Sequence, residues 1–187
     1  MTTIHEMSRE VGISLKKLRK MERKGWLNVS ADDPVTDSIL YAFRTGNRLT
    51  VSQAIALIEA PGLIDTLGSK ADKARQQLAE LGNVQPAPAI VAAELVGAAA
   101  GDASSIRAVM EWCKEAIPPQ GEVTHHYLAV RLLMAVPANL RQFEEKRLPR
   151  VMLQIRRQEE FAGWWRIAPK GSRGITLYSR PSGAFDL

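Results

Sequence analysis

The chain has 187 residues, of which 45% are hydrophobic, and these values are typical of a globular protein with one large domain or two small ones. Its longest apolar run, residues 87–100, contains Glu94 and is too short to cross a membrane, and no N-terminal run is apolar enough for a signal peptide. The chain has one cysteine, Cys113, so an internal disulfide cannot form. We therefore expect a cytoplasmic protein in which Cys113 is a small core residue rather than a nucleophile.

The charge is divided unevenly along the chain, although the total is only +5. Residues 1–30 carry a net charge of +4, residues 31–140 carry −4 and residues 141–180 carry +6. A basic protein without a polyanionic partner would spread its charge more evenly. Two basic ends around an acidic middle therefore favour two separate contacts with nucleic acid.

The first residues of the chain predict two short helices separated by a turn. Thr3 and Glu6 have the spacing of a capping box at the start of the first helix. Gly12 can adopt the positive φ of a tight turn, and Ser14 is a suitable N-cap for a second helix that we expect to reach about residue 24. This pattern is typical of a helix-turn-helix.

The segment IHEMSREVGISLKKLRKMERKGWL resembles the opening of MerR-family regulators, and also the shorter excisionase-type members of that superfamily. The residues that carry the resemblance are Ile4, Glu6, Gly12, Ser14, Leu18, Arg19, Glu22, Gly25 and Leu27. It covers about the first 60 residues, although residues 26–34 lack the Arg, Gly and Tyr of the usual MerR wing. It implies that the second helix enters the major groove of double-stranded DNA, with Arg19 reaching base edges. The implied contacts are Ser14, Lys16, Lys17, Arg19, Lys20 and Arg23.

The middle of the chain predicts further helices. We expect one over residues 35–44 and another that ends at residue 59 and opens on a capping box of Thr50 and Gln53. Residues 63–81 predict one long helix with heptad-like apolar spacing, which fits either a dimerising or domain-linking helix or a surface helix packed on its own domain. Residues 82–88, GNVQPAP, are the best candidate for a linker.

The C-terminal part predicts more helices and then a hairpin. We expect a helix over residues 89–100, one capped by Asp102 that reaches residue 117, and one capped by Thr124 that reaches residue 136. A further helix should begin at Pro137 and be interrupted at Pro149. Residues 164–168 and 175–179 are β-rich and flank the sequence PKGSRG, which predicts a β-hairpin. Trp164, Trp165 and Tyr178 should pack the hairpin on the helices rather than stack on bases.

A basic helix followed by a basic hairpin resembles a winged helix, in which the helix enters the major groove and the wing touches an adjacent groove. The resemblance implies DNA contacts by Arg150, Arg156 and Arg157 from the helix and by Lys170 and Arg173 from the hairpin tip. The alternative is a basic α+β domain that serves a protein partner.

The sequence contains none of the common catalytic or metal-binding motifs, namely a phosphate-binding glycine loop, HExxH or Cys/His metal spacing. His125 and His126 are adjacent, so on a helix they point about 100° apart and are poorly placed to hold one ion together. We therefore expect no metal, no cofactor and no enzymatic activity, and a surface or interfacial role for the two histidines.

Taken together, the patterns predict a mainly α protein with three parts. These are a MerR-like helix-turn-helix over residues 1–60, a connecting helix and linker over 61–87, and a helical domain over 88–187 that ends in a winged-helix-like α+β hairpin. We expect a double-stranded DNA-binding transcriptional regulator, of the kind that mobile elements carry, acting as a homodimer because one recognition helix reads few base pairs. Two alternatives stay open: a DNA-binding accessory factor in replication, recombination or partition, and a helical adaptor whose helices 89–136 bind a protein partner.

Overall fold

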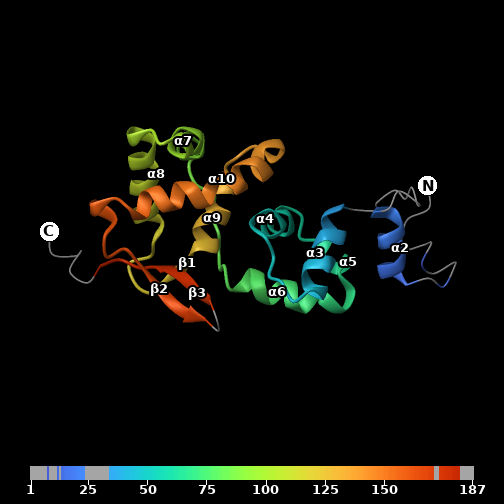
Figure 1. Cartoon of the computed structure of the whole chain (residues 1–187). Coiled ribbons are helices and arrows are strands. Elements are labelled where there is room, and N and C mark those ends of the chain that lie inside the picture. Colours follow the sequence, from blue (N-terminus) through green and yellow to red (C-terminus); the bar gives the residue numbers. More distant parts are fainter. Residues whose placement is uncertain (1–7, 9–11, 13, 24–33, 171–172, 182–187) are drawn as a thin grey trace.

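The computed structural model describes residues 8, 12, 14–23, 34–170 and 173–181, and the predicted Thr3–Glu6 capping box lies outside them. The described chain is mainly helical, with a small sheet beside the helices of its C-terminal part (Figure 1). Its helices are α2 (Leu15–Arg23), α3 (Pro34–Arg44), α4 (Val51–Glu59), α5 (Leu63–Thr66), α6 (Ala71–Ala79), α7 (Ala89–Ala100), α8 (Ala103–Ala116), α9 (His125–Met134) and α10 (Ala138–Arg156). Its strands are β1 (Val123–Thr124), β2 (Trp165–Lys170) and β3 (Arg173–Tyr178).

Gly12, which precedes α2, has the positive φ that the sequence predicts. Gly12 has a φ of +63°, in the left-handed region that glycine adopts without steric cost. The Ser14 carbonyl accepts backbone hydrogen bonds from Lys17 and Leu18, at 2.9 and 3.1 Å, so α2 begins directly after it. Leu18 is buried, as its place on the inner side of the second helix predicts.

The next two helices also lie where the sequence predicts them. Thr50 caps α4 and forms the complete predicted capping box with Gln53, whose own side chain accepts from the Thr50 backbone N–H at 2.9 Å. α4 buries Ile55 and Leu57 and packs against α9, which belongs to the C-terminal part of the chain.

The prediction of one long helix over residues 63–81 is wrong. Gly68 has a φ of +55°, which no α-helix contains, and the segment divides into α5, a 3₁₀ turn over Gly68–Lys70, and α6. The heptad-like positions Leu67, Ala71 and Ala74 are buried in the core of this chain. Of the two predicted roles, the described structure therefore fits a segment packed on its own domain.

The predicted linker connects α6 to α7, but it is held against the fold. The Ala87 N–H donates to the carbonyl of Arg131 at 2.8 Å, and Arg131 Nε donates back to the carbonyl of Gln85 at 2.8 Å. The Arg131 guanidinium also lies over the rings of Trp112 and Tyr127, with 5.4 and 5.6 Å to the ring centroids. One arginine of α9 thus fixes a segment that the prolines alone would leave extended and loose.

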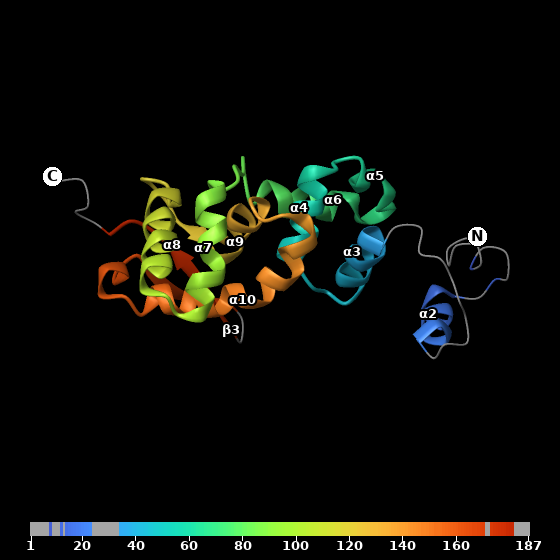
Figure 2. The ribbon, with the colours of Figure 1, turned by 90° about the horizontal axis from the view of Figure 1, so that it is seen from above.

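α8 and α9 begin with the predicted capping residues, whereas α10 differs from the prediction at Pro149. The side chains of Asp102 and Thr124 accept from the backbone N–H groups of Ser105 and Tyr127 at the starts of α8 and α9. Pro149 does not end its helix, because α10 continues through it to Arg156. Proline in a helix interior removes one N–H and pushes on the preceding turn, and α10 is visibly bent in Figure 2.

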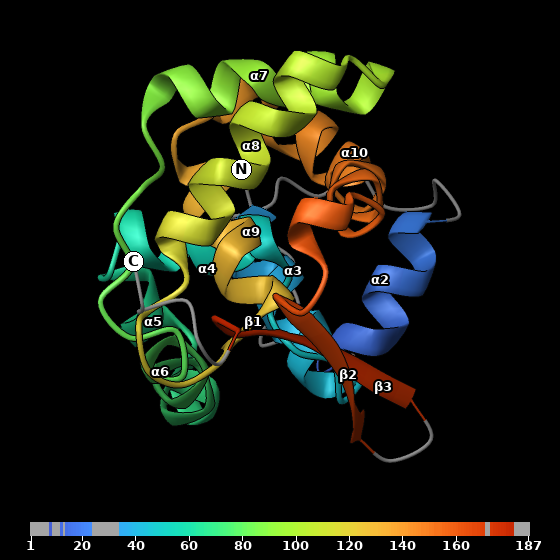
Figure 3. The ribbon, with the colours of Figure 1, turned by 90° about the vertical axis from the view of Figure 1, so that its left-hand side faces the viewer.

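The hairpin is present, and a third strand that the sequence did not predict completes the sheet. β2 pairs with β3 in antiparallel register, from Trp165 opposite Tyr178 to Lys170 opposite Arg173. β1 pairs with the other edge of β3, so the order is β1-β3-β2. The hairpin and α7 lie at opposite ends of the C-terminal part (Figures 1 and 3).

One hydrophobic core connects the described elements from α3 to β3. It runs without a break from Ile39 and Phe43, through Leu57 and Leu133, to Tyr178. The boundaries expected near residues 60 and 87 do not interrupt it. Cys113 is fully buried in this core, as predicted, and burial raises the pKa of its thiol to about 12.

We expect Gly97→Ala to destabilise the protein. A Cβ atom at Gly97 on α7 would lie 2.3 Å from the Ser105 hydroxyl oxygen, which is buried and donates to Glu94. Helix propensity alone predicts a gain of about 1 kcal/mol for this change, whereas the clash should lower the free energy of unfolding by about 1–3 kcal/mol. Urea denaturation measures the difference. The same change in a Ser105→Ala background should cost less, and a Gly97→Ala protein more stable than the wild type would contradict the close approach of α7 and α8.

Candidate nucleic-acid interface

The solvent side of α10 forms a continuous stripe that mixes cationic and apolar residues. Every third or fourth residue from 139 to 157 is exposed, while Leu148, Val151, Met152 and Ile155 face the core. This spacing places the exposed residues on one side of the helix. We call this stripe the outer face of α10; its members are Asn139, Phe143, Lys146, Arg150, Leu153 and, at the C-cap, Arg157.

Three cations of the outer face are open to solvent. Lys146, Arg150 and Arg157 are exposed, and within the described ranges no acidic side chain forms an ion pair with any of them. The helical rise of about 1.5 Å per residue makes this row about 16 Å long. Arg150 and Arg157 are two of the three helix residues that the winged-helix resemblance proposed for DNA contact.

The third of those residues, Arg156, lies on the inner side of α10 toward the sheet. Its Nε donates to the Met152 carbonyl and its Nη1 to the Thr176 hydroxyl, both at 3.3 Å. Its guanidinium also lies 5.3 Å from the ring centroid of Trp165. Arg156 therefore joins α10 to β2 and β3, and it is not part of the outer face.

The hairpin tip follows α10 but is only partly described. Lys170 ends β2, Arg173 begins β3, and the two stand opposite each other in the register; residues 171 and 172 and the side chains of this pair lie outside the described residues. At the base of the hairpin, Trp164 stacks on Phe161 with centroids 6.1 Å apart, and Tyr178 is fully buried. The prediction that these aromatic residues pack the hairpin on the helices is confirmed.

The basic residues of α2 divide into an exposed set and one ion pair. Lys16, Lys17 and Lys20 are exposed, as is Ser14 before them. Arg19 is instead only 17% exposed and forms an ion pair with Asp37 of α3 at 2.5 Å. Arg19 thus connects α2 to α3, and its contact with base edges stays a prediction. The side chain of Arg23 lies outside the described residues.

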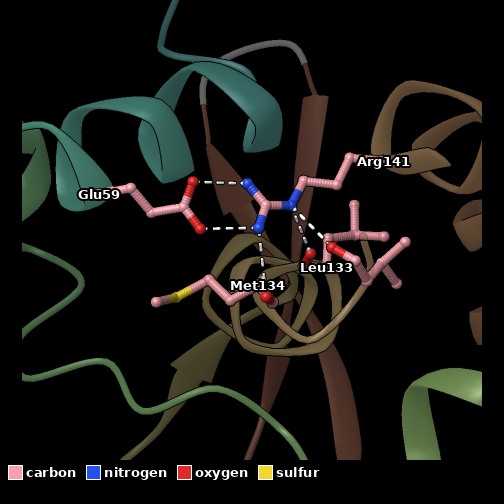
Figure 4. Close-up of polar contacts among 5 residues, drawn as sticks. Glu59, Leu133, Met134 and Arg141 are labelled. Carbon is pink, nitrogen blue, oxygen red and sulfur yellow. Dashed lines mark hydrogen bonds and ion pairs between the residues drawn. The ribbon is translucent and has the colours of Figure 1, made fainter. Parts of the chain in front are cut away.

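The side chain of Arg141, the first residue of the basic C-terminal region, forms hydrogen bonds within the protein (Figure 4). Its two terminal nitrogens donate to the two carboxylate oxygens of Glu59 at 2.6 and 2.7 Å. The same guanidinium donates to the carbonyls of Leu133, Met134 and Val136, at 3.0 to 3.3 Å. It thereby gives donors to two carbonyls in the last turn of α9 and to the Val136 carbonyl just after that helix, and it ties α4 to the start of α10.

A second side chain of α10 holds the opposite end of α4. The Glu145 carboxylate accepts from the backbone N–H of Val51 at 3.1 Å and from the Ser52 hydroxyl. A negative charge at a helix N-terminus is favourable because the helix dipole is positive there. Arg141 and Glu145, one turn apart, therefore fix α10 relative to the N-terminal helices and determine which side of α10 faces solvent.

The two histidines at the start of α9 are both partly buried. Burial, together with the charges of Arg156 and His126, lowers the pKa of His125 to about 4. The Tyr178 hydroxyl is 3.5 Å from Nδ1 of His125. Among the described residues no group of three His, Cys, Asp or Glu side chains could hold a metal ion, and no helix there is long and apolar enough to cross a bilayer.

We expect Arg141→Met to be much more harmful than the equivalent change at an exposed ion pair. The Arg141 side chain is 15% exposed, and its loss leaves Glu59 and three backbone carbonyls without their donor, at a cost of about 2–4 kcal/mol. The control is Arg166→Met, because Arg166 also forms a two-pronged pair, with Glu122, but is 57% exposed, so solvent screens the pair and its removal should change stability little. Chemical denaturation compares the two, and equal losses would show that the Arg141 contacts are not structural.

The protein should lose stability on acidification partly through His125. Because its pKa falls from 6.5 to about 4 on folding, the unfolded chain binds the proton first, and stability decreases as the pH falls through this window. The loss from this group is on the order of 3 kcal/mol at most. The measurement is the free energy of unfolding from pH 7 to pH 4 for the wild type and for His125→Gln. The wild type should lose more than the variant, and parallel curves would show that His125 is accessible to protons in the folded state.

Comparison of the chain with protein-family models, with curated proteins and with solved structures finds no match to any of them. The assignment of a function therefore rests on the charge and geometry described above.

Proposed function

We propose that the protein binds double-stranded DNA as a transcriptional regulator, and that the outer face of α10 is its main contact surface. The observation that carries this proposal is the exposed row of Lys146, Arg150 and the C-cap residue Arg157 on α10, which the hairpin follows after the 3₁₀ turn Glu159–Phe161. Cations that pair with no acid in the described part of the chain are available to neutralise phosphates, and most of the sequence-independent affinity of DNA-binding proteins comes from such contacts.

The order of elements in the C-terminal part supports a winged-helix arrangement. α9 and α10 are joined by only three residues, 135–137, as the two helices of a helix-turn-helix are. In this arrangement the second helix, α10, enters the major groove and the β2–β3 hairpin forms the wing. The pairing of β1 with β3 anchors the hairpin to the start of α9, which keeps the wing close to the helices.

We propose α2 as a second contact with the same duplex. Lys16, Lys17 and Lys20 are exposed there, and the resemblance of this segment to MerR-family regulators points to the major groove. Two contacts in one chain, and a homodimer that doubles them, would give enough base contacts for a specific site.

A protein-binding adaptor is the second candidate, because α7 presents an apolar surface. Ile90 of α7 is 74% exposed and Val96 of the same helix is 53% exposed, although both side chains are apolar. Exposed apolar clusters on a helix are typical of protein contacts. This candidate predicts that the chain has no affinity for duplex DNA even at low salt.

The test begins with selection of a preferred duplex from random DNA by the full chain. Affinity is then titrated at several salt concentrations for the wild type and for the double variant Lys146→Ala, Arg150→Ala. The slope of log affinity against log salt falls by about 0.9 for each phosphate that the protein no longer neutralises, so we expect a reduction of about 2.

The matched control is Arg107→Ala, which removes an exposed cation of α8 that lies 3.7 Å from Glu160 and outside both proposed contacts. Its slope should equal that of the wild type. Unchanged slopes for the double variant would exclude the outer face of α10 from the interface, and no binding by the wild type at low salt would favour the adaptor. A palindromic selected sequence would support the homodimer.

A further inference from the structure

A cavity of about 350 Å³ opens between the N-terminal and C-terminal halves of the molecule. Its walls come from the turn between α3 and α4, the start of α9, the middle and end of α10, and β3. The polar side chains that line it are Arg48, Thr124, His125, His126, Arg156 and Thr176. The volume is in the range of cavities that bind small molecules.

The lining of this cavity is positively charged. It contains the guanidinium groups of Arg48 and Arg156, and none of the described side chains that line it is acidic. The start of α9 adds the positive end of its helix dipole. Of the two nearby carboxylates, Glu145 is engaged by Val51 and Ser52, whereas Glu80 accepts from Nη2 of Arg48 in the neighbouring, smaller hollow and offsets part of its charge.

Hydroxyl groups add hydrogen-bond donors to the cavity. The Thr124 oxygen accepts from the Tyr127 N–H, and the Thr176 oxygen accepts from Arg156. Because each hydroxyl acts as the acceptor in these bonds, its own proton can be donated to a ligand oxygen. Fixed donors and two guanidinium groups around one space are the usual means of holding a phosphate group.

We propose that this cavity binds a small phosphomonoester, whose phosphate lies between Arg48 and Arg156. Pro149 and Ile175 supply an apolar wall on which a short organic group can rest. The site is separate from the outer face of α10, so it goes beyond DNA binding and would place an effector where the two halves of the molecule meet.

The behaviour of the histidines agrees with an anion site. Burial lowers the pKa of His126, and the charge of Arg48 lowers it further, while Glu145 and Glu80 act in the opposite direction. A bound anion would offset the field of the two arginines, so the pKa values of His125 and His126 should rise on binding. The imidazole signals of this pair therefore report occupancy.

The experiment titrates the full chain at pH 7 with phenyl phosphate and with inorganic phosphate, and follows the imidazole NMR signals and the heat of binding. We expect saturable binding with shifts at His125 and His126, tighter for phenyl phosphate than for inorganic phosphate. Arg48→Gln should weaken it at least tenfold, and Arg156→Lys, which keeps the charge but loses the fork, severalfold. The control Arg107→Gln makes the same charge change on α8, outside the cavity, and should leave binding unchanged.

A duplex DNA titration distinguishes a free phosphomonoester from a backbone phosphate. If the site takes a small molecule, Arg48→Gln weakens phenyl phosphate and leaves the affinity for DNA unaltered. Loss of DNA affinity in Arg48→Gln without loss of phenyl phosphate would overturn the proposal, as would non-saturable binding or an equal effect of Arg107→Gln. The DNA result for Lys146→Ala, Arg150→Ala is independent, so failure of DNA binding and failure of this site are separate outcomes.

Discussion

The guanidinium of Arg141 lies where α4, α9 and α10 meet, and the arrangement of the C-terminal helices depends on it. It gives donors at once to the carboxylate of Glu59, to two carbonyls in the last turn of α9 and to the carbonyl of Val136 after it. The planar guanidinium presents several donors in fixed directions, which a lysine ammonium group does not offer. The angle between α9 and α10, and hence the direction of the outer face, is set at this junction.

The same helix balances the electrostatics of α4. Glu145 places a negative charge at the N-terminus of α4, where the dipole favours it, whereas Glu59 places one at the C-terminus, where the dipole opposes it. Arg141 neutralises that second carboxylate. Two residues of α10 thus stabilise a nine-residue helix that would be marginal alone, and α4 in turn fixes the orientation of α10.

The sequence was informative wherever structure depends on neighbours in the chain. The capping residues Thr50, Asp102 and Thr124 and the turn at Gly12 were predictable because each acts within a few residues of itself. The break at Gly68 was missed because heptad-like spacing suggested a helix, and a single glycine carries little weight against that pattern. β1 was missed because two residues have no period of their own and depend on β3 for pairing.

The residues of the candidate site also differ in how well the sequence predicts their environment. The exposure of Arg150, Arg157 and the lysines of α2 agrees with the interpretation of the sequence, whereas Lys146 was missed. The partners of the other arginines could not be predicted. Arg19 and Arg156 have partners 18 and 20 residues away, and Arg141 has one 82 residues away. No local pattern separates such an arginine from one that is open to solvent, because the partner is brought close only by the tertiary fold.

The continuous hydrophobic core from α3 to β3 determines how the protein unfolds. Ile55 and Leu57 of α4 lie in the same cluster as Leu133 of α9. Separation of α4 from α9 would therefore expose apolar surface on both helices. Residues 34–181 should therefore unfold as one cooperative unit in a single transition, whose denaturant dependence reflects the surface of the whole unit. A change that weakens the junction at α4 should therefore lower the stability of the hairpin as well, because both belong to the same cooperative unit.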